Sequence, residues 1–195
     1  MSSSLRAEPP PFMNVAEFLE WPGDGVTRRF QLIDGEVVAM SPASFTHGII
    51  QATLARLIGN RLAETGGRCV LATEPAVVPR VRASLNMRVP DLGVSCAPAS
   101  PGQIEMPDPV LLIEVLSPGN ARVTRANLWA YATIPSVQEL LLVQSTRIGA
   151  ELLRRGPDGS WPAEPEQVGE YGALRLGTVD LTCPLRDIYA GTHLA

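Results

Sequence analysis

Hydrophobic residues recur along this chain with two different periods, which predict helices separated by strands. Between Phe45 and about Thr65, apolar residues recur at three- and four-residue steps, the period of an amphipathic helix, and Gly66-Gly67 is expected to end it. Asn14, with Glu17 three residues later, predicts a shorter helix over residues 15–21 that is capped at its start. Further helical segments are expected over about 123–132 and 184–189.

Shorter apolar runs with β-branched residues predict strands. Asp34-Gly35 is a strong two-residue hairpin signal between a strand over 28–33 and a return strand over 36–40. The other expected strands cover 68–72, 75–81, the run headed by Asp91, 110–116, 137–143 and 149–154, with irregular β structure over 160–177. This order predicts an α+β (mixed α/β) domain in which one central sheet is flanked by helices.

The length and composition of the chain fit one globular domain. With 195 residues, 45% of them hydrophobic, the chain can bury a substantial core, and we expect a disordered tail over 1–12 and a single domain over 13–195. No apolar run approaches the roughly 20 residues that span a bilayer, and the polar N-terminus lacks a signal core. A cytoplasmic protein without a membrane segment is therefore predicted, in which Cys69, Cys96 and Cys183 are buried free thiols rather than disulfides.

All sixteen basic residues are arginine, and lysine is absent from the sequence. This excludes any mechanism that needs a lysine of this chain, such as a P-loop or a Schiff base. The net charge of −4 also argues against a large nonspecific DNA-binding surface. A contact with nucleic acid would need a local cluster of arginines, for which the candidates are Arg80, Arg82, Arg88, Arg122 and Arg125.

Two apolar runs each contain one carboxylate where a hydrocarbon would be expected. Asp91 heads the first run, and Glu114 lies near the end of the second. A buried carboxylate is costly unless it is paired, protonated or bound to a metal, so two such acids on neighbouring strands could share one divalent cation. The alternative is an ordinary strand end at which Glu114 faces solvent or meets an arginine.

His47 lies on the same side of the long helix as Ile50, Leu54 and Ile58, so it is expected to point inward. An inward histidine is either a core residue with satisfied hydrogen bonds or a functional one. Because histidine titrates near neutral pH, His47 could act as a base.

Several phrases resemble the Uma-two family, which is assigned to restriction endonucleases of the PD-(D/E)xK nuclease superfamily. They are Phe30–Val38, Met40-Ser41-Pro42, Val89-Pro90-Asp91, Ile113–Pro118, Asn127–Tyr131 and Pro135–Glu139, and the resemblance covers about residues 14–190. It implies a restriction-endonuclease-like mixed sheet with flanking helices and a site for Mg²⁺ or Mn²⁺. By position it implies Asp91 and Glu114 as metal ligands, the carbonyl of Val115 as a further ligand, and Glu36 and His47 as site members.

The sequence departs from this pattern at the superfamily lysine. The residue two positions past the glutamate is Leu116, and Asn127 stands where many family members have a lysine on the following helix. Asn127 can hydrogen-bond water or phosphate but cannot supply a positive charge. Arg125 lies about 200° away around that helix and is expected to face elsewhere.

Two principal functions follow as hypotheses. The first is a metal-dependent endonuclease that hydrolyses DNA phosphodiester bonds, weakened or altered by the missing lysine. The second is a catalytically inactive nuclease-fold module that binds nucleic acid or a protein partner. An enzyme with another substrate is a weaker third, since fold alone does not fix function. A homodimer is plausible for a nuclease, although the apolar run Leu140–Val143 is better explained as a buried strand.

Overall fold

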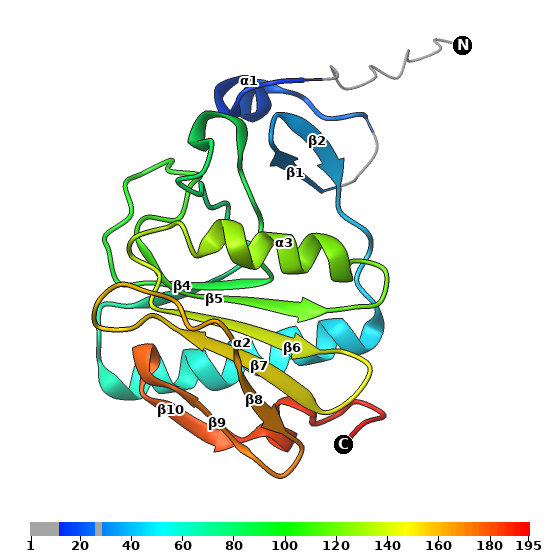
Figure 1. Ribbon diagram of the computed structural model, residues 1–195, viewed down its shortest axis with the longest axis vertical. Coiled ribbons are helices and arrows are strands. Elements are labelled where there is room, and N and C mark those ends of the chain that lie inside the picture. The colour runs from blue at the N-terminus through cyan, green and yellow to red at the C-terminus, as the bar shows by residue number, and fades with distance from the viewer. Residues whose placement is uncertain (1–11, 26–28) are drawn as a thin grey trace.

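The computed structural model describes residues 12–25 and 29–195, in which a six-stranded mixed sheet forms the centre (Figure 1). Its strands follow the spatial order β3 (Val70–Thr73), β4 (Leu92–Ser95), β5 (Pro109–Leu116), β6 (Glu139–Gln144), β7 (Gly149–Arg154) and β8 (Glu166–Gly169). β5 and β6 are parallel, and every other neighbouring pair in this sheet is antiparallel. The predicted α+β fold with a central mixed sheet is confirmed. The expected tail, except Phe12, lies outside the described residues, as does residue 28 of the first expected strand.

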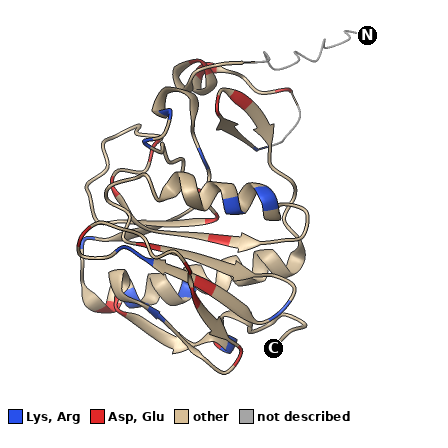
Figure 2. Ribbon diagram, viewed as in Figure 1, with Lys and Arg blue, Asp and Glu red and all other residues tan. Residues whose placement is uncertain are grey.

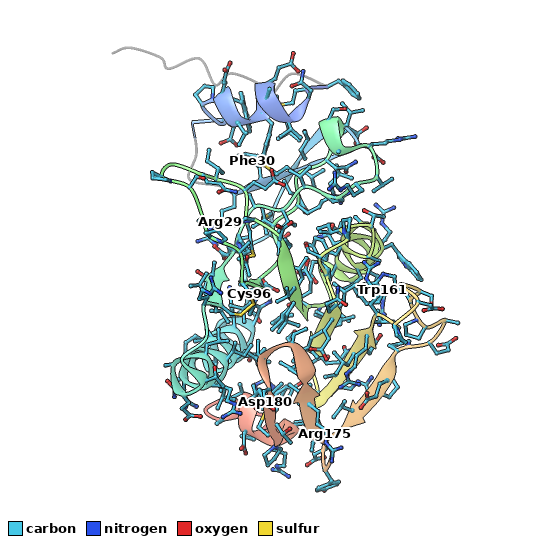
Figure 3. The ribbon with its side chains drawn as sticks, turned by 90° about the vertical axis from the view of Figure 1, so that its left-hand side faces the viewer. Arg29, Phe30, Cys96, Trp161, Arg175 and Asp180 are labelled. Carbon is cyan, nitrogen blue, oxygen red and sulfur yellow. A yellow bond between two sulfur atoms is a disulfide. The ribbon has the colours of Figure 1, made fainter. Side chains whose placement is uncertain are left out.

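Two helices cover opposite faces of this sheet, as the edge-on view in Figure 3 shows. Helix α2 (Phe45–Thr65) packs Ile50, Leu54 and Ile58 against one face, and α3 (Ala121–Tyr131) packs against the other. Neighbouring residues of β5 therefore enter different cores: Ile113 joins the α2 side, and Leu112 joins the α3 side. Because both faces are covered, Leu140–Val143 of β6 is buried, as expected.

The ends of α2 agree with the sequence prediction. The side chain of Ser44 caps its start by accepting the backbone N–H of His47 at 3.2 Å. Gly66 ends the helix in the left-handed conformation, with a φ of 61°. These local signals place His47 in the first turn, beside the end of the sheet where β4 begins.

A parallel pair of strands needs a long crossover, and α3 supplies it between β5 and β6. The helix passes directly over β5 (Figure 1). Glu114 on β5 and Asn127 and Tyr131 on α3 therefore face one another across a single β–α–β unit.

The N-terminal elements form a separate small cluster beside this sandwich. Helix α1 (Val15–Glu20) has the predicted capping box of Asn14 and Glu17. Strands β1 (Phe30–Ile33) and β2 (Glu36–Ala39) form the predicted hairpin, in which Asp34 and Gly35 both have positive φ, at 50° and 89°. Leu32 and Met87 exchange two backbone hydrogen bonds, which attach the hairpin to the segment before β4.

The C-terminal part adds β9 (Ala173–Leu176) and β10 (Leu181–Pro184), an antiparallel pair on the α2 side of the sheet. Short 3₁₀ turns lie at η1 (Ala83–Leu85), η2 (Gly177–Val179) and η3 (Leu185–Tyr189). The segment expected to be irregular, 160–177, thus contains the regular strands β8 and β9. The strand expected over 75–81 is wrong, because this segment forms only isolated bridges through Ala76 and Val77.

The prediction of three free thiols is wrong for two of them. Val70 of β3 pairs with Ser95 of β4, so the flanking residues Cys69 and Cys96 lie opposite each other, and they form a disulfide (Figure 3). Cys183 is free and buried, as expected. Disulfides are uncommon in cytoplasmic proteins, so this bond gives no support to the predicted location. In the described part of the chain, none of the helices has the length and hydropathy needed to cross a bilayer.

Candidate functional site

Asp91 immediately precedes β4, and its carboxylate lies where the backbone of a longer β4 would run. Its Oδ2 accepts the backbone N–H of Val115 at 2.6 Å, and its Oδ1 lies 2.9 Å from Nε2 of His47. The regular ladder of paired residues between β4 and β5 ends at Leu92–Ile113, so it does not reach Asp91. The carboxylate of Asp91 is therefore held by the main chain of β5 together with a side chain from α2.

Glu114 projects from β5 towards α3 and is buried. Its Oε1 accepts hydrogen bonds from the Tyr131 hydroxyl at 2.8 Å and from Nδ2 of Asn127 at 3.2 Å. No hydrogen bond within the described part of the chain uses Oε2. The alternative of a solvent-facing or arginine-paired Glu114 is wrong, since the residue is 5% exposed and forms no ion pair with any described arginine.

The two carboxylates converge on one cleft. Both acids lie at the end of the β4–β5 pair where the ladder stops at Leu92–Ile113, and they are close enough for the charge of Asp91 to raise the pKa of Glu114. Both line a cleft of about 1180 Å³. Its other walls include the first turns of α2 and α3 and the loops at 39–43, 117–119 and 145–146.

His47 points inward from α2, as the helical pattern predicts. Besides the contact with Asp91, its Nδ1 lies 3.3 Å from the hydroxyl of Ser117, which is 3.2 Å from the hydroxyl of Ser145. Both ring nitrogens are thus engaged. This arrangement suits a residue that holds the Asp91 carboxylate in place.

Asn127 joins Glu114 to a buried arginine. Its Oδ1 accepts a hydrogen bond from Nη1 of Arg88 at 2.8 Å, while its Nδ2 faces Glu114. Arg125, two residues earlier on α3, points away, as expected, and it forms a bidentate ion pair with Glu151. Figure 2 shows blue bands in the first half of α3, and charged residues elsewhere are dispersed over the ribbon.

Glu36 is not brought to the cleft. It is exposed on β2 and pairs with Ile33 next to the turn of the hairpin. The hairpin instead contributes Gln31 and Val38 to the cleft wall, two register steps further from the turn. The expectation that Glu36 joins the other site residues does not hold in this structure.

Sequence reasoning missed two residues of this cluster as partners of Glu114 and Asn127. Tyr131 lies four residues after Asn127, so helical spacing could have placed both on one face. Arg88 was noted only as a possible nucleic-acid contact. Its position depends on the backbone pairing of Val77 with Arg88, which no local pattern indicates.

The sequence of residues 15–185 matches the family model Uma2, described as "Putative restriction endonuclease". The chain belongs to the Uma2 family. This Uma2 chain is 29% identical over 193 residues to the uncharacterized protein slr1290 of Synechocystis sp., with 98% of each chain covered. Its fold resembles the crystal structure of a protein from Anabaena variabilis described as a "putative nuclease belonging to DUF820". The TM-score is 0.72 and the sequence identity 17%, and the match covers 91% of this chain and 98% of the other. The resemblance stated from the sequence is confirmed.

Burial governs the electrostatics of the Uma2 cleft. Desolvation, followed by the charge of Asp91, raises the pKa of Glu114 to about 8, although the hydrogen bonds from Tyr131 and Asn127 oppose this shift. Without a cation, Glu114 is therefore mostly protonated at neutral pH. Binding of a divalent cation would be coupled to release of this proton.

The donor atoms of the site fit a hard divalent cation. Two carboxylates face the same cleft, and the carbonyl of Val115 points to the same side of β5 as its N–H, which binds Asp91. Among the described residues, no group of three or more His, Cys, Asp or Glu side chains could hold a metal ion. Mg²⁺ commonly uses only one or two carboxylates and keeps several water ligands, so this oxygen-rich pair fits Mg²⁺ or Mn²⁺ better than Zn²⁺.

Proposed function

We propose that this Uma2 protein is a metal-dependent endonuclease that hydrolyses phosphodiester bonds in DNA. The observation that carries the proposal is the convergence of Asp91 and Glu114, from neighbouring strands, on one cleft. The family supports a nuclease, and the oxygen-rich donor set supports Mg²⁺ or Mn²⁺.

In this proposal Asp91, Glu114 and the Val115 carbonyl would hold the cation. When bound, the cation supplies charge stabilisation at the phosphoryl group and a more acidic water molecule. The chain's own residues fix the ligands: the Val115 N–H and His47 hold Asp91, while Tyr131 and Asn127 hold Glu114 through Oε1. The bonds to Glu114 leave Oε2 available to a cation.

The cleft itself offers little positive charge for a phosphate. Of its described lining residues, only Arg29 is an arginine, and it forms an ion pair with Glu74 at the same cleft. We therefore expect slow cutting and a strong dependence on the divalent cation.

Incubation with supercoiled plasmid and Mg²⁺ or Mn²⁺ tests the proposal. We expect nicked and linear products that are lost in Asp91→Asn, which removes the ligand charge while keeping an oxygen for the Val115 N–H. Glu36→Gln is the matched control, because it removes a carboxylate from the adjoining hairpin outside the cleft, and it should cut as the wild type does. Absence of cutting by the wild type with both metals would contradict the proposal.

A second candidate is a nuclease-fold module that binds nucleic acid or a protein partner without hydrolysis. The complete absence of lysine from the sequence favours it. DNA retained in a gel-shift assay, without products at any metal concentration, would select this function. The homodimer stays a prediction, which the mass of the protein in solution would test.

A further inference from the structure

Arg88 is a buried cation without an ion pair among the described residues. It is 5% exposed, and its backbone pairs with Val77. Its guanidinium donates to two amide oxygens, Oδ1 of Asn86 and Oδ1 of Asn127, both at 2.8 Å. Burial of a charge against neutral amides is costly, so a structural role alone gives no reason for an arginine at this position.

The bond from Arg88 determines which way the Asn127 amide points. A guanidinium has only donors, so the amide atom facing it must be the oxygen. The amide nitrogen then faces Glu114 and donates to Oε1. Without Arg88, the amide could rotate and present its oxygen to Glu114, which disfavours an ionised carboxylate.

From this chain of contacts, we propose that Arg88 is a positioning residue of the candidate metal site, acting through Asn127. By holding the amide, it keeps a donor on Oε1 of Glu114 and leaves Oε2 directed at the cation. The inference rests on the proposed function, because it requires Glu114 to be a metal ligand. Arg88 does not line the cleft and would not touch the substrate.

Charge and positioning predict opposite results when Arg88 is removed. A nearby guanidinium repels a divalent cation, so loss of its charge alone would strengthen metal binding. Loss of the fixed amide weakens binding, because hydrogen-bond partners of metal ligands typically contribute about 10- to 100-fold in affinity. The sign of the change therefore tests the inference.

Titration calorimetry with Mn²⁺ alone measures this sign. Arg88→Met should weaken Mn²⁺ binding by about 10- to 100-fold, and Asn127→Leu should do the same. The double variant should bind no more weakly than Asn127→Leu, because Arg88 acts through Asn127 and the two effects are not additive. Additive effects, or unchanged or tighter binding in Arg88→Met, would overturn the inference.

Two further measurements make the result decisive. Arg122→Met removes an equal charge from an exposed position on α3 and should leave Mn²⁺ binding within about twofold of the wild type. If Arg88→Met does not fold, Arg88→Gln replaces it in the comparison of the two single variants with the double variant. Glutamine keeps a polar group but is too short to reach Asn127. If the wild type does not bind Mn²⁺, both the proposed function and this inference are overturned. If the wild type binds Mn²⁺ and Arg88→Met binds it with the same affinity, only the inference is overturned.

Discussion

The raised pKa of Glu114 makes the stability of the metal-free protein depend on pH. In the folded chain this carboxyl keeps its proton up to about pH 8, whereas its ordinary pKa is 4.5. Between these values the unfolded chain loses the proton and the folded chain retains it, so the free energy of unfolding falls as pH rises. The stabilisation is fully present below about pH 4.5 and is lost by about pH 8.

The size of the effect follows from the shift. Each pKa unit corresponds to about 1.4 kcal/mol, so the shift corresponds to at most about 5 kcal/mol. Because the interaction with a neighbouring charge spreads the titration of Glu114 over a wider pH range, we expect a loss of about 2 to 5 kcal/mol between pH 5 and pH 8. Glu114→Gln carries no titrating group at this position and should lack this part of the pH dependence.

Urea denaturation in EDTA at pH 5, 6, 7 and 8 measures the difference between the wild type and Glu114→Gln. The two free energies of unfolding should diverge as pH rises, with the wild type losing more. Glu64→Gln, which changes an exposed glutamate, should follow the wild type at every pH. Parallel curves for the wild type and Glu114→Gln would refute the reasoning, because they would show that Glu114 titrates alike in the folded and unfolded chains.

Two further predictions concern neighbouring contacts. Tyr131→Phe removes a hydroxyl donor from Glu114, so the pKa of Glu114 should rise further. In the same denaturation series, the loss of stability should then occur at higher pH than in the wild type. The same pH dependence of the free energy of unfolding in both proteins would contradict this. Cys69→Ser removes a bond that closes a loop of 27 residues and should lower the free energy of unfolding by about 3 to 4 kcal/mol, measured by urea denaturation without reductant. Equal midpoints for this variant and the wild type would contradict the disulfide.

Elements with local signals could be predicted from the sequence. The bounds of α2 follow from apolar spacing and Gly66, and the β1–β2 turn follows from Asp34-Gly35. Asp91 and Glu114 were identifiable because charged residues in apolar runs need a structural reason. Their convergence on one cleft depends on the pairing of β4 with β5, which forms between segments about twenty residues apart in sequence.

The errors come from contacts between distant segments. The disulfide depends on the register of β3 against β4, which cannot be predicted from the spacing of the cysteines in the sequence. Glu36 has the residue type of a metal ligand, but the length of the hairpin places it at the turn. Arg88 is adjacent to the predicted site in sequence, yet its contact with Asn127 forms only when α3 packs over β5.

The attachment of Asp91 to the backbone of β5 has a consequence for how such a centre can arise or disappear. The amide that holds this carboxylate would be bonded to a carbonyl if β4 were one residue longer. An ordinary uninterrupted sheet and the proposed cation site thus differ here by a single step of strand length. Small insertions or deletions before Leu92 could therefore convert one into the other while leaving both hydrophobic cores unchanged.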